Sequence, residues 1–427
     1  MRPAEGKIAV VAGARRGIGQ AIAAVVIAVM AAVWSYPAAV SWAGPPEGRF
    51  IASDEPGLDS VRDKARSRGA EKKLVINLGY DGDWYMKKPV MSVADKTVAP
   101  KGGTVHDYAS LSRYFWPDPD KHDGLPYIVK DGLTNPERED LHRYDALRLE
   151  KMADTVYSLS AVYYVTGQEK FAQRAALWLR TWFINPESRM NPSLDFAQGV
   201  PGKVAGTSFG IIETADLIRV VDAALMLESY PGWTVVDKLC LRQWFADYLR
   251  WLTDSPLGIK EKAAGNNHGV WYDAQVAAFA YYIGDYDQVK NVLSESVPQR
   301  IREQIRPDGE MPLEMARTRS LHYVIYNLQA FITLARLGDK VGINLWDYET
   351  TDGRGIRKAI DYVAPYISGE KKWPGQMLVP EREAGAAVYF AMAERHYRMP
   401  QYRQIALKLL GRTIGLRELA AKSLLSK

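Results

Sequence analysis

The chain has 427 residues, of which 47% are hydrophobic and 25% are charged, so it can bury a large core as one big domain or two ordinary ones. Its formal net charge of +5 argues against a broad nucleic-acid surface but leaves room for a local basic cleft that binds a polyanion. Cys240 is the single cysteine, which excludes an intramolecular disulfide and a cysteine-based metal cluster.

The first 43 residues predict an export signal rather than a nucleotide-binding site. Residues 7–19 carry three glycines at the spacing of a dinucleotide-binding turn, but a Rossmann unit also needs a ribose-binding acid about 20 residues further on. No acidic residue follows until Glu47, and a basic start leads instead into an apolar run at residues 21–34. This run is short for a membrane-spanning helix, which needs roughly 20 apolar residues. We therefore expect residues 1–43 to be a signal peptide or an N-terminal anchor, and the protein to be secreted or periplasmic.

Residues 44–427 are expected to form one domain with its core at about residues 88–400. Residues 73–78 predict a strand or a buried segment. Residues 107–132 alternate aromatic residues and prolines with Asp and Gly, which is typical of an ordered loop region. Such a loop either lines a site or is pinned to the core by its own aromatic side chains. Its candidates for binding substrate are Tyr108, Trp116 and Tyr127.

From about residue 141 onward, apolar residues recur at helical spacing. The predicted helices span residues 145–166, 169–183, 211–228, 235–252, 271–283, 287–304, 321–337, 356–367 and 383–397. Short connections between successive helices imply antiparallel hairpins, which could form a bundle, a solenoid or a closed toroid. Periodicity alone does not choose among these. Gln198, between the second and third of these helices, is a further candidate for binding substrate.

Residues 265–271 read GNNHGVW and precede the helix predicted from residue 271. Two adjacent amides beside a histidine can bind an acidic sugar, neutralise its carboxylate and help to move a proton. Asn267 could simply be a helix N-cap, but that explains neither the second amide nor the flanking glycines, which allow a ligand to approach the backbone. If the helix includes His268, its side chain can share one face with the residues three and four positions after it. The candidates for binding substrate here are Asn266, Trp271 and Gln275.

A second group of polar residues lies within ten positions and comprises Glu314, Arg317, Arg319, His322 and Tyr323. The start of the helix predicted there favours an anion, and an arginine fork binds a carboxylate through two hydrogen bonds. The alternative is an Arg–Glu surface network with the tyrosine in the core.

Three stretches in the same order resemble the alginate lyase family of polysaccharide lyases. They are residues 107–111 with 116–119, residues 265–273, and residues 312–323. The similarity spans about residues 88–395, and the combination is more specific than any one stretch. The resemblance implies an all-α fold of the (α/α) toroid type, secretion, and β-elimination on uronic-acid polysaccharides. It also implies that the four catalytic positions are Asn267, His268, Arg317 and Tyr323.

The chemistry of these four residues suits a lyase, which must remove a weakly acidic C5 proton beside a carboxylate. Asn267 and Arg317 can neutralise that carboxylate so that charge develops as an enolate-like species, while His268 donates a hydrogen bond or acts as a base. Tyr323 can abstract the proton if an arginine lowers its pKa, and can then return a proton to the leaving O4. Scattered carboxylates give no metal-ligand set, so we expect no metal and no cofactor. The expected partner is an acidic polysaccharide, with no nucleic acid and no stable membrane partner beyond an N-terminal anchor.

Several alternatives remain open at this point. The step from Arg317 to Tyr323 is six residues, whereas the alginate-specific branch has seven, so Arg319 could take the arginine role. A six-residue step resembles the glucuronan-cleaving relatives, and the substrate could be mannuronate-rich alginate, glucuronan or another uronan. Arg319 and His322 are therefore also substrate-binding candidates.

Two other classes of function also remain open. A non-catalytic uronan-binding protein would not need the tyrosine. A glycoside hydrolase on a helical toroid would need two opposed carboxylates. The candidates for such a pair are Asp107, Asp118, Glu213, Asp273 and Glu314.

Overall fold

The computed structural model describes residues 49–67, 81–379 and 385–411. The predicted signal peptide or anchor at residues 1–43 and the predicted strand at residues 73–78 lie outside the described residues. Within these described ranges, no helix is both long and apolar enough to span a membrane.

An inner layer of helices forms the wall of the molecule's central space, and its members contact one another in chain order. These inner helices are α4 (Ala146–Thr166), α6 (Leu217–Met226), α9 (Asn267–Ile283), α13 (Ser320–Val341) and α15 (Ala386–Tyr397). They are apolar on most sides, because one face packs on its neighbours and another on the outer layer. A further helix, α2 (Glu55–Arg66), packs against α4.

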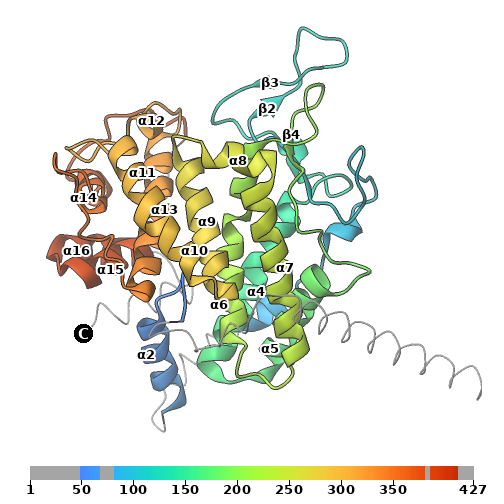
Figure 1. Ribbon diagram of the computed structural model, residues 1–427, viewed down its shortest axis with the longest axis horizontal. Helices are drawn as coiled ribbons and strands as arrows, with labels where there is room; N and C mark the ends of the chain where they lie inside the picture. The colour runs from blue at the N-terminus through green and yellow to red at the C-terminus, as the bar shows by residue number, and fades with distance from the viewer. Residues whose placement is uncertain (1–48, 68–80, 380–384, 412–427) are drawn as a thin grey trace, which may run out of the picture.

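The outer layer consists of α5 (Glu169–Leu179), α7 (Val235–Asp254), α10 (Tyr286–Asn291), α11 (Val297–Gln304), α14 (Ile356–Ile367) and α16 (Pro400–Leu410). The helix α5 packs on α4, α10 on α9, α14 on α13 and α16 on α15, as expected for successive helical hairpins. Figure 1 shows the short helices α8 (Pro256–Lys262) and α12 (Pro312–Met315) at the upper end of the longer helices. This is the all-α, incomplete (α/α) toroid that was expected.

Some helix boundaries differ from the predicted ones for identifiable reasons. The prediction that α9 starts at residue 271 is wrong, because the Asn266 side chain accepts the backbone N–H of His268 and starts the helix at Asn267. The helix α13 continues through Gly338 and ends at Gly342, which has a left-handed φ of 76°. Two predicted helices contain a π-helical turn, at Arg180–Ile184 and at Val292–Ser296.

The strand β1 (Ala109–Leu111) pairs in parallel with β4 (Phe196–Gly199), and β2 (Phe115–Trp116) pairs antiparallel with β3 (Ile128–Val129). The short strands β2, β3 and β4 lie at one end of the helices, at the top of Figure 1. Three 3-10 segments complete the described elements: η1 (Val93–Asp95), η2 (Pro136–Glu139) and η4 (Ser208–Asp216). The predicted loop region at residues 107–132 is thus ordered by small sheets.

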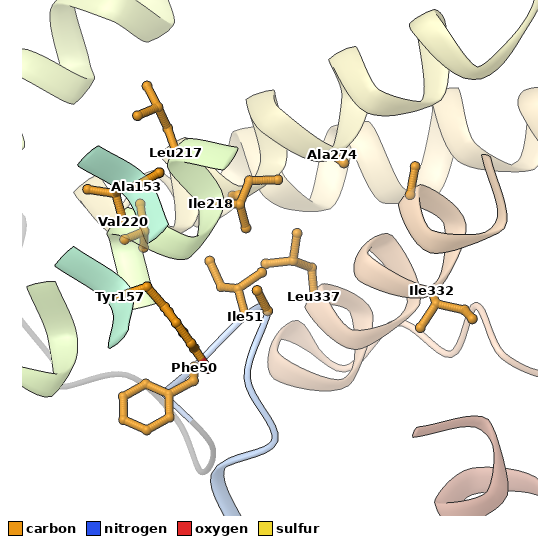
Figure 2. Packing of buried hydrophobic residues seen from close by; sticks show 14 of the residues in the cluster. Phe50, Ile51, Ala153, Tyr157, Leu217, Ile218, Val220, Ala274, Ile332 and Leu337 are labelled. Atoms are coloured by element: carbon orange, nitrogen blue, oxygen red, sulfur yellow. The ribbon is translucent and has the colours of Figure 1, made fainter. Parts of the chain in front are cut away.

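An extended segment at residues 50–53, here called the strap, runs between the inner helices. Phe50 and Ile51 are fully buried. Figure 2 shows them packed near Tyr157 of α4, Ile218 of α6 and Leu337 of α13. The strap therefore joins three inner helices that are far apart in the sequence.

Buried charges hold both edges of the strap. The Asp222 carboxylate accepts the N–H groups of Ile51 at 2.6 Å and Ser53 at 2.7 Å. The Arg336 guanidinium donates to the carbonyl oxygens of the same two strap residues, at 2.5 Å each. Since Asp222 is fully buried, these bonds satisfy backbone groups that no water can reach. Ala52 of the strap also forms part of the wall of the cleft described next.

Candidate active site

A cleft of about 910 Å³ opens among the inner helices and the strand-bearing loops. Eight of the thirteen predicted site residues line it: Gln198, Asn266, Asn267, His268, Trp271, Arg317, His322 and Tyr323. The polar residues around His268 and those around Tyr323 are some fifty positions apart in the sequence. They nevertheless line one surface, because α9 and α13 are neighbours in the inner layer.

Two predicted substrate-binding residues lie in the core instead of the cleft, so those predictions are wrong. Gln275 is fully buried, donates to the Ile211 carbonyl oxygen at 3.2 Å and accepts from the Thr214 hydroxyl at 2.7 Å. Tyr108 is also fully buried and donates to Glu213 at 2.9 Å. Their polar atoms are used to link helices and loops.

Three other predicted contacts lie outside the cleft lining and anchor loops. The Trp116 indole donates to the Leu133 carbonyl oxygen at 2.9 Å. Tyr127 donates to Glu137 at 2.7 Å, and burial together with that carboxylate raises the pKa of Tyr127 to about 12. Arg319 forms a backbone bridge to the loop that contains Met377. For Trp116 and Tyr127, these contacts agree with the interpretation of a loop pinned by its own side chains.

His268 lies in the first turn of α9 and is oriented by a buried carboxylate. Its Nδ1 lies 2.6 Å from Oε1 of Glu261, which is only 2% exposed. A carboxylate at this distance accepts a hydrogen bond from the N–H at Nδ1 of the ring. The other ring nitrogen, Nε2, is then left for a ligand in the cleft. The ring also meets Phe209 edge-on, with centroids 6.5 Å apart.

Asn267 is fixed by a second buried carboxylate. Its backbone N–H donates to Oε1 of Glu314 and its Nδ2 to Oε2, each at 2.7 Å. Burial raises the pKa of Glu314 above its usual range, although the Asn267 hydrogen bonds and the charges of Arg317 and His268 act in the opposite direction. Asn266, the N-cap of α9, is half-buried and also lines the cleft.

Arg317 is held at the cleft wall by Asp131, a residue of the loop after β3. Its Nη2 lies 2.5 Å and its Nε 3.2 Å from the two carboxylate oxygens. Burial alone would raise the pKa of Asp131, but the Arg317 hydrogen bond and charge lower it below its usual value, so the pair is ionic. The Arg317 guanidinium carbon lies 3.8 Å from the centroid of the Tyr323 ring, which places a fixed positive charge over that phenol.

Tyr323 is 7% exposed, and its hydroxyl lies 2.6 Å from the hydroxyl of Tyr114. Burial and Tyr114 raise the pKa of Tyr323, whereas Arg317 lowers it, and the net direction is upward. The expected effect of the arginine is therefore present, but it is outweighed. Tyr323 is therefore a neutral phenol that can donate a proton.

An aromatic wall completes this side of the cleft. Trp271 packs on Tyr326 with ring centroids 4.9 Å apart, and its indole N–H donates to the Tyr326 carbonyl oxygen at 3.1 Å. His322 stacks on the same tyrosine, with an interplanar angle of 7°. Flat rings beside hydrogen-bonding groups suit the faces and hydroxyls of a sugar.

Gln198 reaches the cleft from a strained backbone position. Its φ of 45° lies in the left-handed region that residues other than glycine rarely adopt. Hydroxyls hold it there: Ser110 accepts its N–H at 2.7 Å, and Ser112 and Thr207 donate to its carbonyl oxygen at 2.5 and 3.0 Å. Backbone strain of this kind is often concentrated at ligand-binding sites.

Four further residues that the sequence did not predict line the cleft: Arg113, Tyr114, Asp131 and Glu261. Arg113 is notable because no hydrogen bond or ion pair holds its guanidinium within the part of the chain that the structure describes. The signal that could have found Arg113 and Tyr114 is their position in the aromatic loop at residues 107–132, which was considered only for its sugar-stacking residues.

The carboxylates considered for a glycoside hydrolase do not form an opposed pair in the cleft. Only Glu213 of those five residues lines it. Asp273 pairs with Arg300 at 2.9 Å in the core, and Glu314 is occupied by Asn267. Among the described residues, no group of three or more His, Cys, Asp or Glu side chains is placed to hold a metal ion.

Known proteins share this architecture. The crystal structure of an alginate lyase from Bacteroides ovatus is 33% identical, with a TM-score of 0.80 over 86% of this chain and 97% of that chain. Alginate lyase A1-III, solved as a His-to-Ala variant complexed with a tetrasaccharide, is 17% identical, with a TM-score of 0.58 over 90% of this chain and 98% of that chain. The more distant likeness shows a common fold. A comparison with curated proteins finds no match.

A family model described as alginate lyase matches residues 92–373, which is most of the described chain. Together with the Bacteroides relative, this match confirms the resemblance drawn from the three motif stretches. The chain belongs to the alginate lyase family, and it is a polysaccharide lyase with the (α/α) toroid fold.

Proposed function

We propose that this enzyme cleaves a uronic-acid polysaccharide by metal-free β-elimination in the cleft between α9 and α13. The observation that carries the proposal is the arrangement around Tyr323, whose hydroxyl meets Tyr114 at 2.6 Å and whose ring lies 3.8 Å from the Arg317 guanidinium carbon. His268 and Asn267 line the same cleft. A proton-transfer group thus stands beside donors that can neutralise a sugar carboxylate.

In the proposed reaction, Asn267, His268 and Arg317 bind the carboxylate next to C5. The C5–H bond breaks, its electron pair forms the C4=C5 double bond, and the C4–O4 bond breaks. Tyr323 takes the C5 proton and returns it to the leaving O4. Because Tyr323 is a neutral phenol, its own hydroxyl proton must leave first, and it passes through the adjacent Tyr114 hydroxyl, which lines the cleft, to solvent water. The positive charge of Arg317 then stabilises the phenolate.

Alginate is the first substrate to test. The Bacteroides relative is described as an alginate lyase, and the solved A1-III variant holds a tetrasaccharide. Glucuronan is the second candidate, because it presents the same C5 carboxylate and because the step from Arg317 to Tyr323 has six residues. The mannuronate units of alginate differ from glucuronate only in the orientation of one ring hydroxyl.

A substrate panel tests the proposal. The purified enzyme is incubated with polymannuronate, polyguluronate and glucuronan, and the products are weighed by mass spectrometry. Elimination leaves a product one water lighter than the hydrolytic product. Unsaturated products from at least one polymer support the proposal. Products at the hydrolytic mass would replace it with a glycosidase, and binding without any product would favour a non-catalytic uronan-binding protein.

We also propose that the enzyme acts outside the cytoplasm, after removal of residues 1–43. The support is the basic start and the uncharged apolar run at residues 21–34. N-terminal sequencing of the protein recovered from the periplasm or the medium should begin at Gly44. A full-length chain in the membrane fraction would identify an uncleaved anchor instead.

A further inference from the structure

The side chain of Asn267 has a polar atom that nothing satisfies. Its Nδ2 and its backbone N–H both reach Glu314 at 2.7 Å, but its buried Oδ1 has no hydrogen-bond partner within the described residues. A buried oxygen without a donor is unfavourable, and such atoms are rare in folded proteins. The orphaned oxygen therefore needs a physical explanation.

The same arrangement is unfavourable for the proposed substrate. Asn267 lines the cleft although it is fully buried, and because Nδ2 is occupied by Glu314, the side-chain polar atom that remains is Oδ1. An acceptor oxygen would repel the sugar carboxylate, whereas an amide N–H would bind it. A 180° turn of the amide about its last bond exchanges Oδ1 and Nδ2 and leaves every other atom in place.

We propose that Glu314 works as a neutral carboxylic acid that sets the orientation of the Asn267 amide. In this state the hydroxyl at Oε2 of Glu314 donates to Oδ1 of Asn267, while Oε1 still accepts the backbone N–H. The Nδ2 group then carries its N–H donors to the position of the orphaned oxygen. Glu314 is a positioning residue, because it acts through Asn267 and not on the sugar. The role in catalysis rests on the proposed lyase function.

The surroundings of Glu314 favour the neutral state. Glu314 is 1% exposed, and within the described ranges its carboxyl group accepts hydrogen bonds from the two nitrogens of Asn267 and from no Lys or Arg side chain. The charged groups that act on it are Arg317, after α12, and His268, in α9. Both favour ionisation, but burial outweighs them and raises the pKa of Glu314. A carboxylic acid kept neutral so that it can donate a hydrogen bond is a known catalytic device.

Two substitutions at Glu314 separate the neutral from the ionised form. Glu314→Ala removes both contacts, and kcat/KM on the best uronan should fall about 100-fold. Glu314→Gln offers the same C=O and a donor N–H, so it should restore kcat/KM to within about tenfold of the wild-type value. It should also remove the loss of activity that ionisation of Glu314 causes at high pH, since glutamine does not titrate.

The matched control is Glu261→Gln, at a carboxylate with nearly the same burial that faces a nitrogen of His268. This change should lower kcat/KM by about 10- to 100-fold, because the amide can no longer accept the Nδ1 proton as a carboxylate does. If Glu314→Gln is as inactive as Glu314→Ala, or if it keeps the high-pH loss of the wild type, the neutral-acid role is overturned.

Infrared difference spectroscopy tests the proton itself without relying on catalysis. The wild-type spectrum minus that of Glu314→Gln at neutral pH should contain the C=O stretch of a protonated carboxyl group. Carboxylate bands in its place would overturn the inference even in a protein that is a proven lyase. If no uronan is cleaved, the lyase proposal fails, yet the infrared band still decides the state of Glu314.

Discussion

At the scale of single residues, the structure separates two arginines that the sequence left equivalent. Arg317 lines the cleft, pairs with Asp131 through two hydrogen bonds and lies over the ring of Tyr323. Arg319, two positions later, lies outside the cleft lining, and its backbone bridges to Met377. The six-residue step from Arg317 to Tyr323 therefore belongs to the arginine that lines the cleft.

Replacing each arginine by lysine tests this assignment. Arg317→Lys should lower kcat/KM by about 100- to 1000-fold, because lysine cannot keep the paired geometry that fixes the charge beside the carboxylate. Arg319→Lys is the matched control and should stay within about threefold of wild type. The two variants are compared by initial rates on the same polymer. A larger loss for Arg319→Lys than for Arg317→Lys would contradict the assignment.

The residues that are proposed to act on a sugar could be predicted from the sequence, but the residues that hold them in place could not. Asn267, His268, Arg317 and Tyr323 stand in recognisable local patterns. Their partners come from distant loops and helices: Tyr114 is 209 positions from Tyr323, and Asp131 is 186 from Arg317. Such pairs form only when the chain has folded, so local spacing carries no signal for them.

At the scale of secondary structure, most predicted helices exist, and the errors lie at their ends. Apolar periodicity located the body of α9 but missed its first turn, because the Asn266 cap and not an apolar residue starts the helix. That error matters, because the first turn of α9 contains Asn267 and His268, which both line the cleft. The strap at residues 50–53 was also missed, because four residues are too few to show a period.

The strap makes a prediction about stability. Asp222→Ala leaves the N–H groups of Ile51 and Ser53 without acceptors and removes a negative charge opposite the buried Arg336. The free energy of unfolding should fall by about 3–5 kcal/mol, the range seen when one partner of a buried charge pair is removed. Urea unfolding followed by tryptophan fluorescence measures this loss.

The control for the strap is Asp247→Ala, which removes a partly exposed carboxylate from an ion pair with Arg250 on α7. It should change the free energy of unfolding by about 0.5 kcal/mol or less. Equal unfolding midpoints for Asp222→Ala and Asp247→Ala would show that the strap does not hold the inner helices together.

At the scale of the whole molecule, the toroid explains why residues separated by two hundred positions share one cleft. Repeated helical hairpins could be predicted from periodicity, but periodicity left a bundle, a solenoid and a toroid equally open. The family resemblance selected the toroid, and the order of contacts among the inner helices agrees with it. The arrangement of the inner layer sets the loop with Tyr114 against the start of α13, so the architecture itself assembles the proposed proton-transfer site.

The most direct test of the proposed reaction follows the ultraviolet absorbance of the C4=C5 double bond. Wild-type enzyme mixed with its best uronan should produce a steady rise. Tyr323→Phe should abolish the rise but still bind an oligosaccharide of that uronan in calorimetry, because only the hydroxyl that moves the proton is lost. Cleavage of the polymer without any absorbance, or a Tyr323→Phe enzyme with normal turnover, would contradict proton transfer by Tyr323 in a β-elimination.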